Sequence, residues 1–256
     1  MRRREFITIL GGAAAMWPLA ARSEPRLPVI GFVRLTTLQD SATFLSAFRR
    51  GLAETSYIEG QNFTIEARFA SNQVDRLPNL MAELVSMDVA VLVATGGTIS
   101  ARAAKAATST IPIVFTTGDD PVKVGLVASL DKPGGNLTGV SVFTNRLGSK
   151  RLALLHEMVP SASPIGILVN PTNADTEDEA KDVQDAARSL GVQVFVVSAG
   201  KAEDLDGAFA TLMQQGTRAL FVAADTFFTG QRSQISILAA RHRLPTSWNS
   251  RIEVEA

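Results

Sequence analysis

The sequence predicts an α/β protein made of two doubly wound parallel-sheet lobes joined by a hinge. Three observations lead to this class. Short apolar, β-branched segments alternate with segments of helical period from residue 27 to residue 115. The same alternation starts again at residue 147, beyond a Pro-Gly-Gly turn at residues 133–135 that cannot stay helical. Between the turn and the restart, residues 137–142 are extended, and we expect them to lead from one lobe to the other.

Each expected strand of the first lobe is a short run of Val, Ile, Leu and Phe that ends in polar residues. These strands are residues 27–35, 63–69, 89–94 and 111–115. Helices are expected where apolar residues recur at helical spacing, and Ser41 is the candidate cap of the first of them. The further helices are expected at residues 77–87, 99–107 and 124–130. Repetition of strand and helix favours a parallel sheet with right-handed crossovers.

The second lobe repeats this rhythm. Its expected strands are residues 165–169, 192–197 and 219–223, and its expected helices are residues 147–159, 176–190, 203–215 and 231–242. Gly191 is placed to end the longest helix, because glycine adopts the left-handed conformation found after helix ends. Residues 225–230 are expected to form a loop at the carboxyl end of a strand.

Composition excludes several classes of protein. Of the 256 residues 46% are hydrophobic and 20% are charged, which argues against disorder. The formal net charge is zero and no basic block follows the first residues, so nucleic acid is not an expected partner. The chain contains no cysteine, which excludes disulfides, thiolate catalysis and iron–sulfur clusters.

The first 23 residues have the pattern of an export signal. Arg3 and Arg4 are followed by Glu5 and two apolar residues, which fits the twin-arginine motif. A short apolar stretch broken by glycines follows, and Ala21-Arg22-Ser23 offers small residues to a signal peptidase. An ordinary amphipathic helix is the alternative. We therefore expect residues 1–23 to be a signal peptide and the mature protein to be periplasmic.

Open parallel sheets bind ligands at the carboxyl ends of their strands, so the polar loops there supply the candidate site. Hydroxyls, amides and helix N-termini can hold a carboxylate, whereas an aspartate can hold an amine. The same residue types also make ordinary turns, and that reading stays open for each of them. The candidate ligand-binding residues are Thr36, Thr37, Gly97, Thr98, Thr117, Asp120, Asn170, Asn173 and Asp225.

No catalytic, cofactor or metal site is expected. Asp119 and Asp120 could bind a ligand or a metal, but no third ligand lies at usable spacing, and a role at the start of a helix is favoured for at least one of them. His156 and His242 both fall within expected helices, and no G-x-S-x-G motif is present. The Gly-rich loop at residues 95–98 matches neither phosphate-binding fingerprint.

Several segments together resemble one family along the whole chain. They are MRRREFITILGGAAAMWPLAAR, FRRGL at 48–52, IPIVFTTGDDPVKVGLVASLDKPGGNLTGVS, KRLALLHE at 150–157, ILVNP at 167–171 and LAARH at 238–242. The chain resembles the periplasmic substrate-binding components of ABC transporters. That resemblance implies a type I periplasmic-binding-protein fold, a small-molecule ligand, delivery to an ABC permease in the inner membrane, and no enzymatic activity. Some members of this family bind aromatic amino acids.

Two alternatives remain at this stage: a periplasmic enzyme on a similar α/β scaffold, and a ligand sensor for a membrane receptor. We expect the lobes to comprise residues 27–140 and residues 141–256. Members of the family continue past the position of residue 256, so the second lobe is expected to be incomplete at its end. A chain of this length is therefore expected to be marginally stable, because apolar surface would stay in water.

Overall fold

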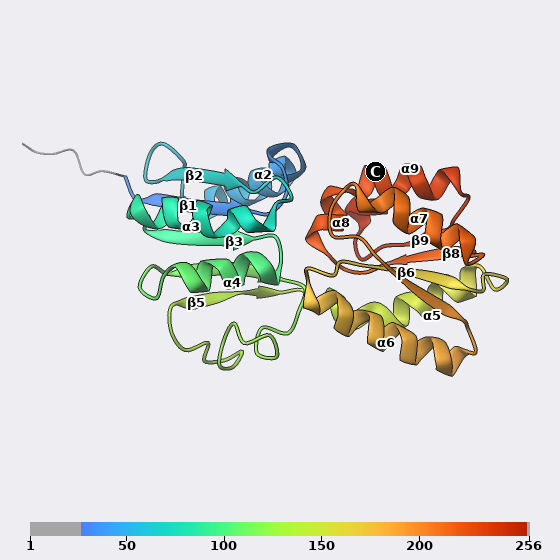
Figure 1. Ribbon diagram of the computed structural model, residues 1–256. Helices are drawn as coiled ribbons and strands as arrows, with labels where there is room; N and C mark the ends of the chain where they lie inside the picture. The colour runs from blue at the N-terminus through green and yellow to red at the C-terminus, as the bar shows by residue number, and fades with distance from the viewer. Residues whose placement is uncertain (1–26, 255–256) are drawn as a thin grey trace, which may run out of the picture.

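The computed structural model describes residues 27–254, so the expected signal peptide lies outside the described residues. Two sheets lie side by side, each with helices on both faces (Figure 1). The first sheet is entirely parallel and has the order β2-β1-β3-β4-β5. Its strands are β1 (Val29–Arg34), β2 (Thr64–Phe69), β3 (Val91–Thr95), β4 (Ile113–Thr117) and β5 (Leu137–Ser141). The predicted doubly wound α/β class is confirmed.

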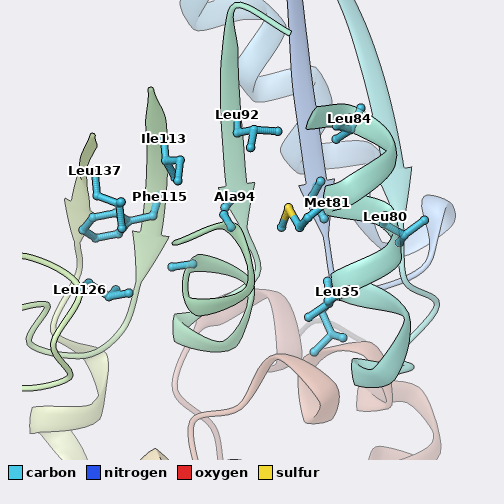
Figure 2. Close-up of a cluster of buried hydrophobic side chains, with 14 of the residues drawn as sticks. Leu35, Leu80, Met81, Leu84, Leu92, Ala94, Ile113, Phe115, Leu126 and Leu137 are labelled. Carbon is cyan, nitrogen blue, oxygen red and sulfur yellow. The ribbon is translucent and has the colours of Figure 1, made fainter. Parts of the chain in front are cut away.

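Apolar side chains cover both faces of the first sheet. The helical elements are α2 (Leu38–Glu54), η1 (Val74–Arg76), α3 (Leu77–Ser86) and α4 (Thr98–Ala107). Figure 2 shows the core under α3 and α4, where Met81, Leu92 and Phe115 are almost fully buried. A second cluster, which includes Phe32 and Leu45, packs α2 on the opposite face. Burial on both faces explains why these strands are continuous apolar runs.

The second sheet is also parallel and has the order β7-β6-β8-β9. Its strands are β6 (Ile165–Val169), β7 (Val194–Ser198), β8 (Ala219–Val222) and β9 (Thr246–Ser247). The helical elements are η2 (Thr144–Leu147), α5 (Gly148–Met158), α6 (Ala174–Leu190), α7 (Asp204–Gln214), α8 (Thr226–Gly230), α9 (Arg232–Arg241) and α10 (Arg251–Val254). Gly191 ends α6 with φ of 67°, as predicted. Within residues 27–254, none of the helices combines the length and apolar character needed to cross a bilayer.

The prediction of a helix at residues 124–130 is wrong, because this segment forms turns and bends. Its apolar residues are core residues all the same, and Leu126 and Val127 are buried. Gly125 adopts φ of 71°, which breaks a right-handed helix. Lys105 of α4 then donates hydrogen bonds to the carbonyl oxygens of Gly125 and Leu126 at 2.6 and 3.2 Å. These bonds satisfy carbonyls that a helix would have satisfied internally.

Two smaller expectations also differ from the structure. The region expected to be a loop at residues 225–230 contains the short helix α8, which starts because the Asp225 carboxylate accepts N–H bonds from Phe227 and Phe228. The cap of α2 is Thr37 rather than Ser41, and the helix begins four residues earlier than a Ser41 cap would allow. Ser41 instead hydrogen-bonds the hydroxyl of Thr36 inside the lobe at 2.8 Å.

Candidate functional site: the cavity between the lobes

The strands of the first sheet point toward the second lobe, so their carboxyl ends meet it (Figure 1). A cavity of about 290 Å³ lies at this junction. A smaller one of about 80 Å³ shares Gly97, Gly118, Thr144, Thr226, Thr229 and Asn249 with it. We call the two together the interlobe cavity. A larger hollow of about 890 Å³ runs beside β7 and α6 on the second lobe alone, outside the cleft.

The structure brings five of the nine predicted site residues to the interlobe cavity and leaves four outside its lining. Those on the cavity are Gly97, Thr98, Thr117, Asn173 and Asp225. Those elsewhere are Thr36, Thr37, Asp120 and Asn170. Each of the five lies just beyond or at the carboxyl end of a parallel strand, which is the position that the sequence pattern indicated.

Asp225 is held by four donors. Asn170 and Asn173 donate side-chain amide bonds to it at 3.2 and 2.8 Å, and the backbone N–H groups of Phe227 and Phe228 donate at 2.8 and 3.3 Å. Burial raises the pKa of Asp225, and these four donors act in the opposite direction. The carboxylate therefore ties the loop after β6 to the start of α8, and so shapes the cavity wall.

Thr98 and Thr117 belong to a network that includes a residue that the sequence analysis did not select. Their hydroxyls lie 2.7 Å apart, and the Thr98 hydroxyl also hydrogen-bonds Asp119. Asp119 in turn accepts a bond from the side chain of Asn145, at the entrance to the second lobe. Asp119 thus joins the first lobe to the chain that leaves it.

The remaining predicted residues have local partners. Thr36 accepts a bond from Arg34 Nε at 3.2 Å, and Thr37 caps α2. Asp120 accepts backbone bonds from the two residues after Pro121 and forms an ion pair with Arg146. The predicted helix-start role is wrong for Asp119 and Asp120, because no helix follows and Asp120 caps a turn instead.

Asp120 lines a separate acidic hollow of about 240 Å³ at the outer edge of the interface. The two lobes meet here through ion pairs between Lys123 and Asp178 at 2.8 Å and between Arg102 and Asp175 at 3.6 Å. Burial, and then the nearby charge of Asp119, raise the pKa of Asp175 to about 6. Carboxylates of opposite lobes therefore face one another across this part of the interface.

Besides Asp119, three charged or aromatic residues of the cavity wall were missed: Arg34, Phe44 and Glu253. The guanidinium carbon of Arg34 lies 3.6 Å from the centre of the Phe44 ring, and Arg34 is only 7% exposed. Arg34 is the single charged residue of an otherwise apolar strand, which was a usable signal in the sequence. Glu253 belongs to the second lobe and accepts hydrogen bonds from Thr229 and Ser250 of the same lobe. The bond from Thr229 is 2.8 Å long.

A buried ion pair supports the floor of the second lobe. Arg151 donates to Glu179 at 2.9 Å and to the carbonyl oxygens of Val222 and Ser247 at 2.6 and 3.0 Å. The other oxygen of Glu179 accepts the N–H of Ala224 at 2.6 Å. Burial raises the pKa of Glu179 to about 7, while Arg151 and this N–H group oppose the shift. The pair fixes the end of β8, from which the loop of Asp225 starts.

The cavity wall offers several kinds of hydrogen-bonding group to a ligand. No histidine lines it: His156 is in α5, and His242 stacks on Phe209 with 6.2 Å between ring centres. Residues 27–254 contain no cluster of three His, Asp or Glu side chains placed to hold a metal ion. The wall offers hydroxyls, amides, glycine backbone, one guanidinium, one aromatic ring and the three carboxylates of Asp119, Asp225 and Glu253.

Comparisons with known proteins agree with this description. The chain is 29% identical over 198 residues to the "Tyrosine-binding protein" of Clostridioides difficile (strain R20291), and the match covers 77% of this chain and 56% of that protein. The structure of an ABC domain in complex with L-Trp from Streptococcus pneumonia superposes with a TM-score of 0.78 at 20% identity, over 90% of this chain and 76% of that one.

A third solved structure is similar over the same share of the chain but has a lower TM-score. The ligand-free, open structure of a substrate binding protein with adhesive properties from Clostridium difficile has a TM-score of 0.56 at 25% identity, with the same coverage. The family of ABC transporter substrate binding proteins matches residues 36–254. The chain therefore belongs to the ABC transporter substrate binding protein family, whose type I periplasmic-binding-protein fold it adopts.

Proposed function

We propose that this protein captures a small organic molecule between its two lobes and delivers it to the permease of an ABC importer, without making or breaking a bond. The observation that carries the proposal is the interlobe cavity, whose wall is built from both lobes. A ligand held by both walls stabilises the closed arrangement over the open one. Closure can then signal occupancy to the permease.

An amino acid is the ligand that we propose. The tyrosine-binding relative and the neighbour in complex with L-Trp support this choice. The wall supports it too, because a cation (Arg34), a carboxylate (Glu253) and an aromatic ring (Phe44) line one cavity. The chain spans 56% of the length of the tyrosine-binding relative. That relative's ligand therefore supports our choice of ligand, which is itself a proposal.

We further propose that the protein works in the periplasm. The twin-arginine pattern at residues 3–7 supports export, and an inner-membrane permease would then be the partner. We assign residues 27–140 and 141–256 to the two lobes. Replacing Arg3 and Arg4 with lysine should retain the precursor in the cytoplasm, and processing can be followed by fractionation.

Isothermal titration of the protein without residues 1–23 tests the binding function. Pooled amino acids should give a saturable heat with one site, and chromatography of the mixture should return each ligand unchanged. A product that accumulates with time would instead support an enzyme. An absence of binding to amino acids, sugars and other small solutes alike would contradict the receptor function.

A further inference from the structure

Arg34 is a buried cation whose terminal nitrogens have no partner within residues 27–254. It ends β1, is 7% exposed, and lines the interlobe cavity. Its Nε donates to the Thr36 hydroxyl at 3.2 Å, whereas Nη1 and Nη2 form no hydrogen bond with the described residues. Burial lowers its pKa to about 10, so the side chain remains charged at neutral pH.

The nearest acidic group is already engaged. Asp40 accepts a bond from Arg232 Nη1 at 2.8 Å and another from the Thr37 hydroxyl at 2.6 Å. Among the described residues, none forms a salt bridge with Arg34. The charge of Asp40 partly offsets the effect of burial on the pKa of Arg34, but its carboxylate does not bond the guanidinium. A buried cation without a bonded partner is unfavourable, and a ligand anion could supply that partner.

The surroundings define how an anion could approach. Phe44 covers one face of the guanidinium, with 3.6 Å between the guanidinium carbon and the ring centre. The planar edge with the two terminal nitrogens is then left for the anion, and two parallel N–H bonds match a carboxylate. Gly96 and Gly97, with φ of 108° and 86°, bring backbone without side chains to the same wall. The N-terminus of α4 adds a partial positive charge there.

We propose that Arg34 binds the carboxylate of the ligand through this edge, and that the physiological ligand is therefore a small carboxylic acid. The proposal rests on the function proposed above, because it names the group by which the captured molecule is recognised. A single unpaired cation matches one carboxylate better than a doubly charged phosphate. Glu253 on the opposite side of the cavity also disfavours a second negative charge.

The first test compares acids with their neutral analogues on the unmodified protein. One pool contains amino acids, including L-tyrosine and L-tryptophan, with small aromatic and aliphatic carboxylic acids. The matched pool contains the corresponding primary amides, and a third pool contains sugars and polyols. Titration should show binding from the acid pool, and the amide of the bound acid should bind about 100-fold more weakly.

The outcomes separate this proposal from the receptor function. Equal binding of an acid and its amide, or binding from the sugar pool alone, overturns the role of Arg34 and leaves the receptor function standing. No binding from any pool overturns both.

The second test uses Arg34→Gln, with Arg34→Lys and Arg49→Gln as matched variants. Arg34→Gln should weaken binding of the acid about 100-fold, and Arg34→Lys should weaken it less, because lysine keeps the charge but not the planar fork. Arg49 pairs with Glu59 on the surface of the first lobe, so Arg49→Gln should leave affinity unchanged. Affinity within threefold of the original in Arg34→Gln overturns the proposal.

Stability distinguishes a ligand anchor from a structural arginine. Without ligand, Arg34→Gln should unfold at the same or a higher temperature than the original protein, since it removes an uncompensated buried charge. A lower unfolding temperature together with unchanged affinity would show a structural role and contradict the proposal. If Arg34→Gln fails to fold, the titration of acids against their amides on the unmodified protein tests the role of Arg34.

Discussion

Asp40 of α2 accepts a hydrogen bond from Arg232 of α9, 192 residues away along the chain and on the other lobe, at 2.8 Å. The two side chains are 19% and 23% exposed, so water screens the pair only in part. The pair has two consequences. It links the two lobes, and it engages the Asp40 carboxylate, which forms no hydrogen bond with Arg34.

Arg232→Gln should therefore weaken ligand binding about five- to thirtyfold, which corresponds to about 1–2 kcal/mol. The closed arrangement loses an ion pair, and the freed Asp40 competes with the ligand for Arg34. Calorimetry measures the affinity, and small-angle scattering measures the shift toward an open form. Asp40→Asn combined with Arg232→Gln tests the coupling: the two losses should not add. Fully additive losses would contradict a direct pair.

Gly97→Ala should weaken binding about tenfold. Gly97 has φ of 86° and ψ of −178°, a conformation that is largely confined to glycine. A Cβ atom here would also lie 3.0 Å from the hydroxyl oxygen of Thr226 on the other lobe, so closure would be hindered. Gly207 in α7 is the matched control, because a Cβ atom there meets nothing within 4 Å. Gly207→Ala should leave affinity unchanged and slightly raise the unfolding temperature. Equal affinities for the two variants would contradict the prediction.

Arg151→Met should lower the free energy of unfolding by about 3–5 kcal/mol. Arg151 and Glu179 are 9% and 2% exposed, and loss of the guanidinium leaves a buried carboxyl group without its partner and two carbonyl oxygens without a donor. Urea unfolding measures the change. Arg188→Met is the control, because Arg188 pairs with Asp185 on the exposed surface of α6 and should cost less than about 1 kcal/mol. Similar losses of unfolding free energy in both variants would show that burial of the Arg151–Glu179 pair does not increase its contribution to stability.

How far the sequence predicted the fold depends on burial. Strands such as β6 are buried on both faces, so a bare apolar run marks them, and the structure places β6 at the predicted bounds. The prediction of a helix at residues 124–130 was wrong because Leu126 and Val127 are core residues on an irregular backbone. Its shape depends on Lys105, a donor from another element, which no local pattern reveals.

The candidate site was predictable as a region but not as a set of contacts. The rule that ligands bind at strand ends placed Gly97 and Asp225 on the cavity wall. The rule does not say which polar groups are consumed by the protein itself, and Asp225 proves to be held by four internal donors. That Arg34 has no bonded acidic partner depends on the pairing of Asp40 with Arg232, which only the folded chain shows.

Ligand affinity should rise as the pH falls through 6, because closure is coupled to protonation of Asp175. Burial, and then the charge of Asp119, raise the pKa of Asp175 from 3.8 to about 6 in the closed arrangement, although Arg102 lies 3.6 Å away and opposes the shift. Thr98 also faces this carboxylate, and Lys123, Asp120, Asp178, Glu179, Asp182 and Arg146 line the same hollow.

The sign follows from proton binding. With the lobes apart, Asp175 lies away from Asp119 and its pKa returns toward 3.8, so the closed form binds more protons between about pH 4 and pH 6. The closed form is thus favoured below pH 6 and loses this advantage as the pH rises through 6. After allowance for solvent screening, affinity should be about three- to tenfold higher at pH 5 than at pH 7.5.

Asp175→Asn isolates this effect. The variant should bind more tightly than the original protein at pH 7.5 and should show little change between pH 5 and pH 7.5. Glu179, with a pKa of about 7, also titrates in this range. Burial is the largest cause of its shift and Asp119 of the first lobe is a smaller one, so Glu179 acts mainly on unfolding. Its folded-state pKa is raised, so its contribution to stability is lost as the pH rises toward 7 and is the same in both proteins. Equal pH dependence of affinity in the variant and the original would show that Asp175 does not couple protons to closure.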